Sequence, residues 1–356
     1  MTEPVTEPLA APTTIDADPA PDPGATSFLT SLLVVVVVLA GIELFYRDSP
    51  VDLQLRKGSG HIATKELEYA QIGGDIVTTG NSRMYHAVRP QVMTDELQKV
   101  SGKSLSVYNF GIPSGSPPMF LMIADTVARH KPPPKLFVLG VAAVQSSCCE
   151  ELAVAGAPFG MNWSAVPYFV KAAWWSSPED AGLAVFLGAS RLLSGRAELL
   201  ASIHELRIAP ETKFMDRGYW SMGGRVSPAQ QDVRAKGRSI PYADAMDKSK
   251  GAHIHVTTHR YYAEAIELLQ RVGTKVVILG SPQARQLDWY HDDKHTYAEY
   301  LAEMKKLSDR YGVPFIDMND PPVITNADFV DGDHLSDPGA EIFSKYLADE
   351  LAKYVP

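Results

Sequence analysis

The most constraining feature of this chain is the alternation of short apolar runs with helical patterns from about residue 74 onward. Short apolar, β-branched runs are typical of strands buried on both faces, and the longer amphipathic stretches between them are typical of covering helices. This order requires right-handed crossovers between parallel strands. It predicts a flavodoxin-like α/β fold, a parallel five-stranded sheet with helices on both faces. The expected strands are 76–79, 105–110, 136–141, 276–279 and 314–318, and the expected helices are 116–130, 257–272, 296–311 and 338–353.

An insertion at about residues 145–255 interrupts the alternation between the third and fourth strands. It is rich in tryptophan and mixes helical with glycine-containing stretches. An insertion at the carboxyl edge of a parallel sheet lies over the crevice where such sheets bind ligands, which favours a lid or a substrate surface. Packing close to a membrane is an equally good interpretation.

Three segments precede the alternating region. Residues 1–27 are rich in Pro, Ala, Thr and acids and contain no Lys or Arg, a composition typical of a disordered tail. Residues 28–46 are apolar apart from a few polar positions, with Glu43 as their one charge. A helix of that length rises about 28 Å, close to the hydrocarbon thickness of a bilayer. We expect a transmembrane helix there, then a juxtamembrane linker over 47–73 and one domain over 74–356.

Two alternatives for residues 28–46 meet objections. A helix or strand buried in a soluble core needs neighbours to pack against, and the polar tail before this segment offers none. A cleaved signal peptide needs a basic n-region, and no Lys or Arg precedes residue 28. The positive-inside rule places the large domain in the cytoplasm, because basic residues follow the span and none precedes it. A short acidic tail can nevertheless cross a membrane, so the rule leaves the orientation open.

Composition argues against a nucleic-acid partner, because the formal charge is −9 and the chain has no basic stripe to displace phosphate counterions. The two cysteines, Cys148 and Cys149, are adjacent and form neither a loop-closing framework nor a zinc site on their own. No Gly-x-Gly-x-x-Gly or Walker sequence opens the first helix, which argues against a nucleotide-binding flavodoxin-like domain.

Two groups of histidines have spacings that metal sites use. His253, His255 and His259 lack a nearby Asp, Glu or Cys to complete a set of ligands, and a solvated helix start explains them. His291 and His295 fit a polar helix surface, with a substrate-facing role as the alternative. We therefore expect neither a metal nor a cofactor.

The sequence Gly80-Asn81-Ser82 follows the first expected strand and begins a helix. A side chain at the carboxyl end of a parallel strand points into the ligand crevice, and the N–H of Ser82 lies among the unpaired donors of a helix start. Ser82 could therefore supply a nucleophile and part of an anion site. The tripeptide is also ordinary turn and cap chemistry, so its meaning depends on the far end of the chain.

A second loop, after the last expected strand, contains Asp331, Asp333 and His334. In a parallel sheet this loop can emerge on the same edge as Ser82, which predicts that a serine, a histidine and an acid converge. A serine hydroxyl needs an imidazole to accept its proton, and the imidazole needs a carboxylate to hold its tautomer. Asp331 is the expected acid because its spacing lets it fold back on His334, whereas Asp333 is expected to point away.

An oxyanion intermediate also needs hydrogen-bond donors. Gly111 ends the second expected strand, and its N–H together with that of Ser82 is predicted to provide them. Asn81, Arg83 and Gln145 are candidate substrate-binding residues. Arg83 is expected to pack or to bind a substrate anion, with a surface salt bridge as an equally good alternative.

These blocks resemble those of the SGNH, or GDSL-like, hydrolase family over about residues 74–144 and 256–354. Gly80-Asn81-Ser82 is similar to the family's first block, Gly111 to the second, and the pair Asp331 and His334 to the fifth. The resemblance implies acyl transfer through an acyl-enzyme on Ser82. The third block departs from the family, because Ala142-Ala143 stands where the family has an asparagine donor; Gln145 is a possible substitute.

More narrowly, the N-terminal span with Gly-Asn-Ser-Arg-Met and Asp-Gly-Asp-His-Leu-Ser resembles the membrane-anchored branch related to the teichoic-acid D-alanyl transfer protein and the alginate O-acetylation proteins. This resemblance implies a single-pass protein of the cell membrane with an extracytoplasmic catalytic domain. It implies a serine esterase or O-acyltransferase that moves an acyl group, acetyl above all, on cell-surface polysaccharide. A polytopic membrane O-acyltransferase is the implied partner, and a catalytically inactive scaffold for such a partner is the alternative.

Overall fold

The computed structural model describes residues 23–46, 61–142, 166–173, 214–231, 233–234, 256–284 and 296–355, together with residues 182 and 185. The chain divides into two compact units, Met1–Phe45 and Tyr46–Pro356, which we describe one at a time. Several positions singled out in the sequence lie outside the described residues: Gln145, Cys148, Cys149, His253, His255, His291, His295 and most of the 145–255 insertion.

In the first unit, α1 (Pro23–Tyr46) covers the segment predicted to span a membrane. Its apolar side chains from Leu32 to Leu39 are between 48% and 62% exposed. No helix within the described residues is both long enough and apolar enough to cross a bilayer. That finding does not support the transmembrane prediction for residues 28–46.

The second unit is built on a sheet of five parallel strands in the order β2-β1-β3-β4-β5, which confirms the flavodoxin-like α/β prediction. β1 (Ile76–Gly80) lies between the edge strand β2 and the central strand β3, so the residues that follow it emerge between these strands on the carboxyl edge. The other strands are β2 (Val107–Gly111), β3 (Leu136–Val141), β4 (Lys275–Gly280) and β5 (Phe315–Ile316).

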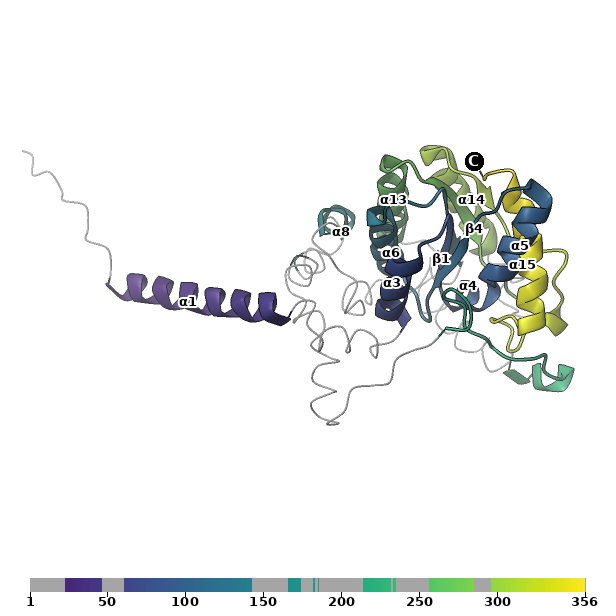
Figure 1. Cartoon of the computed structure of the whole chain (residues 1–356), viewed down its shortest axis with the longest axis horizontal. Helices are drawn as coiled ribbons and strands as arrows, with labels where there is room; N and C mark the ends of the chain where they lie inside the picture. Colours follow the sequence, from purple (N-terminus) through teal and green to yellow (C-terminus); the bar gives the residue numbers. More distant parts are fainter. Residues whose placement is uncertain are drawn as a thin grey trace, which may run out of the picture. The chain divides into compact units, whose positions relative to one another are not determined.

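Helices cover both faces of this sheet (Figure 1). On one face, α6 (Pro117–Arg129) packs against α13 (Val256–Arg271), which also contacts α8 (Val166–Ala173) and α14 (Thr296–Tyr311). On the other face, α5 (Pro90–Ser101) packs against α15 (Asp337–Ala352), which also contacts α4 (Ser82–Ala87) and the 3-10 turn η3 (Asn326–Asp328).

Two hydrophobic cores result, one on each face, because successive strand side chains point to opposite sides. Val77 and Phe137 belong to the core under α6 and α13, whereas Ile76 and Val138 belong to the core under α5 and α15. All four side chains are fully buried. The buried apolar strands predicted from the sequence therefore serve both cores at once.

A further helix, α3 (His61–Ile72), occupies the second half of the segment predicted to be a linker. Tyr69 on this helix is 1% exposed, and its ring meets those of Tyr108 and Phe110 on β2 at centroid distances of 5.1 and 5.6 Å. The aromatic contacts fix α3 against the outer strand of the sheet.

The outer side of β2 is closed by two basic residues from elsewhere in the chain. Lys65 on α3 is fully buried, and its Nζ donates to the carbonyl oxygens of Asn109 at 2.7 Å and Gly111 at 2.6 Å. Nε of Arg217 donates to the Val107 carbonyl at 2.7 Å, and the backbone carbonyl of Arg217 accepts the Asn109 N–H at 3.0 Å. These contacts satisfy backbone groups that an edge strand would otherwise leave unpaired.

Candidate active site

The turn from β1 into α4 presents Ser82. Gly80 has a φ of +149°, and a Cβ at this position would lie 2.5 Å from Cγ of Met84, so the turn requires glycine. Asn81 is the N-cap of α4, and its Oδ1 accepts the N–H of Arg83 at 3.0 Å. Ser82 is the first residue of the helix, where an N–H has no acceptor within the helix.

Ser82, His334 and Asp331 lie in a continuous hydrogen-bonded relay, as the sequence predicts. Nε2 of His334 is 2.8 Å from Oγ of Ser82, and Nδ1 is 2.9 Å from Oδ2 and 3.0 Å from Oδ1 of Asp331. A carboxylate only accepts hydrogen bonds, so Nδ1 carries the proton and Nε2 is left to accept one from the serine hydroxyl. The geometry allows general-base activation of Ser82.

The loop that carries His334 is held rigidly by its own backbone. Gly332 has a φ of +83°, which folds the chain back so that Oδ1 of Asp331 accepts the N–H groups of Asp333 at 3.1 Å and His334 at 2.9 Å. The Val330 N–H donates to the His334 carbonyl at 2.8 Å. The same carboxylate therefore shapes the turn and orients the imidazole.

Arg83 is buried rather than at the surface, which agrees with the predicted packing role and replaces the alternative of a surface salt bridge with a buried ion pair. Its side chain and that of Asp333 are each 2% exposed, and Oδ1 of Asp333 accepts from Nε at 3.1 Å and Nη2 at 2.8 Å. Asp333 points away from His334, as predicted. The pair joins the residue after Ser82 to the residue before His334, so it ties the two loops of the site together.

The structure does not support Gly111 as an oxyanion donor. The next N–H along β2, that of Ile112, donates to the Gly80 carbonyl on β1, so the Gly111 N–H points to the opposite side of the strand. There it donates to Oδ1 of Asn109 at 2.8 Å. Glycine is needed for another reason, because a Cβ at this position would lie 2.5 Å from the backbone nitrogen of Tyr85.

Other predicted binding residues have structural partners or are not described. Asn81 is 8% exposed and caps α4 as stated above. Ala142, at the position where the sequence resemblance led us to expect an asparagine, is buried after the end of β3, and Gln145 lies outside the described residues. Of the two predicted oxyanion donors, the N–H of Ser82 is the one whose position at a helix start suits the role.

His86 is a site residue that the sequence reasoning missed. Its ring meets that of His334 edge-on, with a centroid distance of 5.1 Å and an interplanar angle of 82°. Nδ1 is 2.8 Å from the carbonyl oxygen of Trp220, and burial lowers the pKa of His86 to about 4. The ring is therefore neutral at pH 7. Its position four residues after Ser82, one helical turn onward, is the signal that would have revealed it.

Gln283 is a second missed residue, on the segment that follows β4. Its N–H donates to the Asn319 carbonyl at 2.9 Å, and the next N–H, of Ala284, donates to the Gly332 carbonyl at 2.9 Å. The segment thus lies against the turn between Asp331 and His334. The side-chain amide is 2% exposed, and neither Nε2 nor Oε1 has a hydrogen-bond partner. A buried amide of this kind is costly unless a ligand completes its hydrogen bonds.

Within the described ranges, no group of three or more His, Cys, Asp and Glu side chains is arranged to hold a metal ion. His259, which the sequence placed at a solvated helix start, lies on α13 with Nε2 3.7 Å from Oε2 of Glu303. Burial lowers the pKa of His259, so its ring is largely neutral at pH 7.

Comparison with known proteins gives three findings. A protein-family model aligns with residues 244–356, which is less than half of the chain. No curated protein matches the sequence.

Two solved structures are similar to the chain in part. A lipase/acylhydrolase from Enterococcus faecalis is 10% identical, with 79% of this chain and 97% of that chain covered and a TM-score of 0.36. A GDSL-like lipase from Bacteroides thetaiotaomicron is 13% identical, with 82% and 98% covered and a TM-score of 0.37.

Proposed function

We propose that this chain is a serine esterase or O-acyltransferase that works through an acyl-enzyme on Ser82. The observation that carries the proposal is the relay in which His334 joins Oγ of Ser82 at 2.8 Å to the Asp331 carboxylate at 2.9 Å. This arrangement meets the two needs of nucleophilic acyl transfer, a base for the serine proton and an acid that holds the base.

The proton movements follow from the tautomer of His334. Oγ of Ser82 attacks the ester carbonyl while its proton passes to Nε2, and Asp331 stabilises the imidazolium that forms. The imidazolium then protonates the leaving alcohol, and the acyl group remains on Oγ. Water or another hydroxyl, deprotonated by Nε2, attacks the acyl-enzyme and releases Ser82. His86 stays neutral beside the imidazolium, so it adds no repulsive charge.

The substrate class and the cellular location are proposed from the sequence. The resemblance to the membrane-anchored branch supports acetyl esters of cell-surface carbohydrate as substrates, and a membrane O-acyltransferase as partner. It also supports a membrane-tethered protein with its catalytic domain outside the cytoplasm. The apolar run within α1 is the sequence feature behind the tether.

One observation favours a second candidate function, an inactive scaffold that serves a membrane O-acyltransferase. The Gly111 N–H donates to Asn109, and Ala142 replaces the family's asparagine, so two family donors to the oxyanion are missing. Loss of one such donor typically lowers the rate by about 10²–10³. The scaffold would keep the fold and the relay while losing turnover.

Labelling with a fluorophosphonate probe separates the two functions, because the probe reacts with an activated serine. We expect the full chain to be labelled at Ser82 and to hydrolyse p-nitrophenyl acetate. Both signals should disappear in Ser82→Ala and in His334→Ala. Ser114→Ala is the matched control, because Ser114 is an exposed serine in the loop after β2, on the same edge of the sheet.

Absence of labelling in folded wild-type protein would refute the enzyme and favour the scaffold. Labelling that persists in Ser82→Ala would place the nucleophile elsewhere. Circular dichroism establishes that each variant is folded before its labelling is scored.

A further inference from the structure

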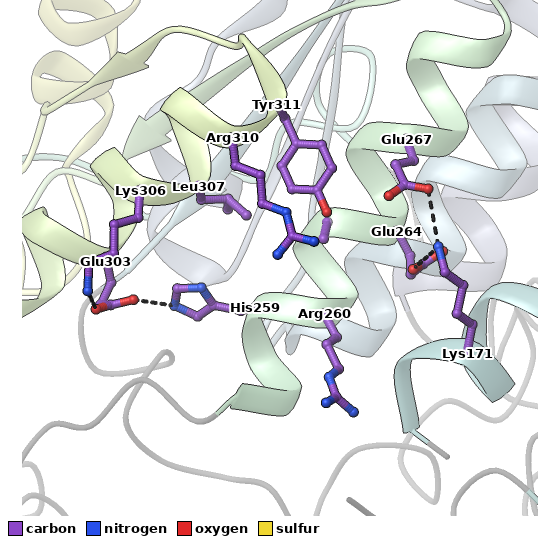
Figure 2. Close-up of a pocket in the computed structure, with 11 residues that line it drawn as sticks. Lys171, His259, Arg260, Glu264, Glu267, Glu303, Lys306, Leu307, Arg310 and Tyr311 are labelled. Atoms are coloured by element: carbon purple, nitrogen blue, oxygen red, sulfur yellow. Dashed lines mark hydrogen bonds and ion pairs between the residues drawn. The ribbon is translucent and has the colours of Figure 1, made fainter. Parts of the chain in front are cut away.

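A cavity of about 590 Å³ lies between α8, α13 and α14, and none of its lining residues belongs to the Ser82 site (Figure 2). Its volume is within the range of small-molecule pockets. The lining is mainly charged, with four basic and three acidic side chains: Lys171, Arg260, Lys306, Arg310, Glu264, Glu267 and Glu303.

The three carboxylates in this cavity are paired with the lysines. Lys171 reaches Glu264 at 2.6 Å and Glu267 at 3.2 Å, and Lys306 pairs with Glu303 (Figure 2). Arg271 also pairs with Glu267 at 3.2 Å, so each of the three carboxylates has a basic partner other than Arg260 and Arg310.

Arg260 and Arg310 take no part in these ion pairs. Neither Arg260 nor Arg310 has a carboxylate partner within the described part of the chain, and Nη1 of Arg260 is buried without any hydrogen-bond partner. Arg310 extends from α14, and its guanidinium lies beside the ring of Tyr311, 5.4 Å from the ring centroid (Figure 2). Burying a charged donor such as Nη1 of Arg260 without an acceptor is costly, so an anion that enters the cavity would relieve that cost. Arg310 is exposed and adds a second positive charge from α14.

The cavity also offers one unused acceptor. Glu264 is 5% exposed, and while one of its oxygens binds Lys171, its Oε2 is buried and has no hydrogen-bond partner. A hydroxyl group is the simplest donor for this oxygen. A ligand that carries both a negative group and a hydroxyl would complete the hydrogen bonds of the arginines and of Oε2 of Glu264.

We propose that this cavity is a binding site for a hydroxylated anion whose carboxylate or phosphate group is held by Arg260 and Arg310. Guanidinium groups suit both anions, because their planar N–H groups make charge-assisted, bidentate hydrogen bonds. The hydroxyl donates to Oε2 of Glu264. Sugar acids and sugar phosphates share this chemistry, and the site is independent of the reaction at Ser82.

Isothermal titration of the full chain at constant ionic strength tests the proposal with D-glucuronate, inorganic phosphate and neutral D-glucose. Saturable binding of glucuronate or phosphate, with none for glucose, is expected. Arg260→Gln and Arg310→Gln should each weaken that binding roughly tenfold or more, the usual effect of losing a charge-assisted hydrogen bond. Lys305→Gln is the control, because Lys305 is on α14 like Arg310 but is 72% exposed, pairs with Asp309 and does not line the cavity.

Two further variants sharpen the test. Glu264→Gln should weaken glucuronate binding less than the arginine variants do, because it keeps an oxygen acceptor. If a glutamine variant does not fold, Arg260→Lys and Arg310→Lys replace it, since they keep the charge but lose the bidentate fork. The proposal is overturned by the absence of saturable binding of both anions, by glucose binding as tightly, or by affinities that Arg260 and Arg310 variants leave unchanged.

Discussion

Replacing Asp333 with asparagine removes the anionic half of the ion pair that joins α4 to the His334 turn. Arg83→Gln removes the cationic half. Both side chains are 2% exposed and are linked at 2.8 and 3.1 Å, so each single variant leaves a buried charge without its ion-pair partner. We expect either change to destabilise the fold strongly, because a buried charge is tolerated mainly through its pairing.

The magnitude follows from burial. Removing one member of a buried pair typically costs about 3–5 kcal/mol, a large share of the roughly 5–15 kcal/mol by which a domain is stable. The double variant Arg83→Gln with Asp333→Asn leaves no unpaired charge, so it should lose less than the sum of the singles. Lys345→Gln is the control: it breaks a pair with Glu341 in which both side chains are more than 40% exposed, and it should cost less than about 1 kcal/mol.

Urea unfolding at pH 7 gives these free energies, and the rate of fluorophosphonate labelling gives the effect on the site. Because the pair adjoins both Ser82 and His334, we expect labelling of the folded single variants to slow roughly tenfold or more through misplacement of the relay. Single variants that each cost less than about 1 kcal/mol and label at the wild-type rate would refute the role we assign to this pair.

Three more predictions concern His86, Lys65 and Gln283. Burial lowers the pKa of His86 from 6.5 to about 4, so below about pH 6.5 the unfolded chain binds a proton that the folded chain excludes. The free energy of unfolding should therefore fall by roughly 1.5 kcal/mol between about pH 6.5 and pH 5 because of this residue. Urea unfolding of His86→Asn across this pH range should show a smaller fall. Lys65→Leu leaves the carbonyl oxygens of Asn109 and Gly111 without their donor and should lower the free energy of unfolding by about 2 kcal/mol or more; an unchanged urea midpoint would contradict the contacts at 2.7 and 2.6 Å. Gln283→Leu removes an unpartnered buried amide, so it should keep or raise the melting temperature while lowering p-nitrophenyl acetate turnover; lower stability with unchanged turnover would show that the amide serves only the fold.

The alternation of apolar runs is sufficient to predict the parallel sheet, because strands buried on both faces need continuous hydrophobic residues. The hydrophobic pattern is less informative for helices that bury only a few apolar side chains. α5 was not among the expected helices, since its apolar face rests on Pro90, Met93 and Leu97. α3 lies within the segment that we expected to be a linker. Its position depends on Tyr69 packing against β2 and on Lys65 donating to the carbonyl oxygens of β2, and these partners are distant in the sequence.

For the site, spacing predicts Asp331 and His334 because a turn of four residues determines their geometry locally. The partners of Arg83 and Gly111 depend on tertiary structure. The sequence gives no sign that Arg83 would meet a residue 250 positions away, or that the Gly111 N–H would face the outer side of β2. The same is true of Gln283, which reaches the His334 turn through a backbone contact between separate loops.

The closed outer side of β2 bears on how this protein behaves at high concentration. An edge strand with free carbonyl and N–H groups is a template on which another polypeptide can add a strand and begin aggregation. Along β2 the Val107 carbonyl, both backbone groups of Asn109 and the Gly111 carbonyl already have hydrogen-bond partners in Lys65 and Arg217. The lysine and the arginine thus leave an incoming polypeptide fewer free backbone groups on this strand with which to pair.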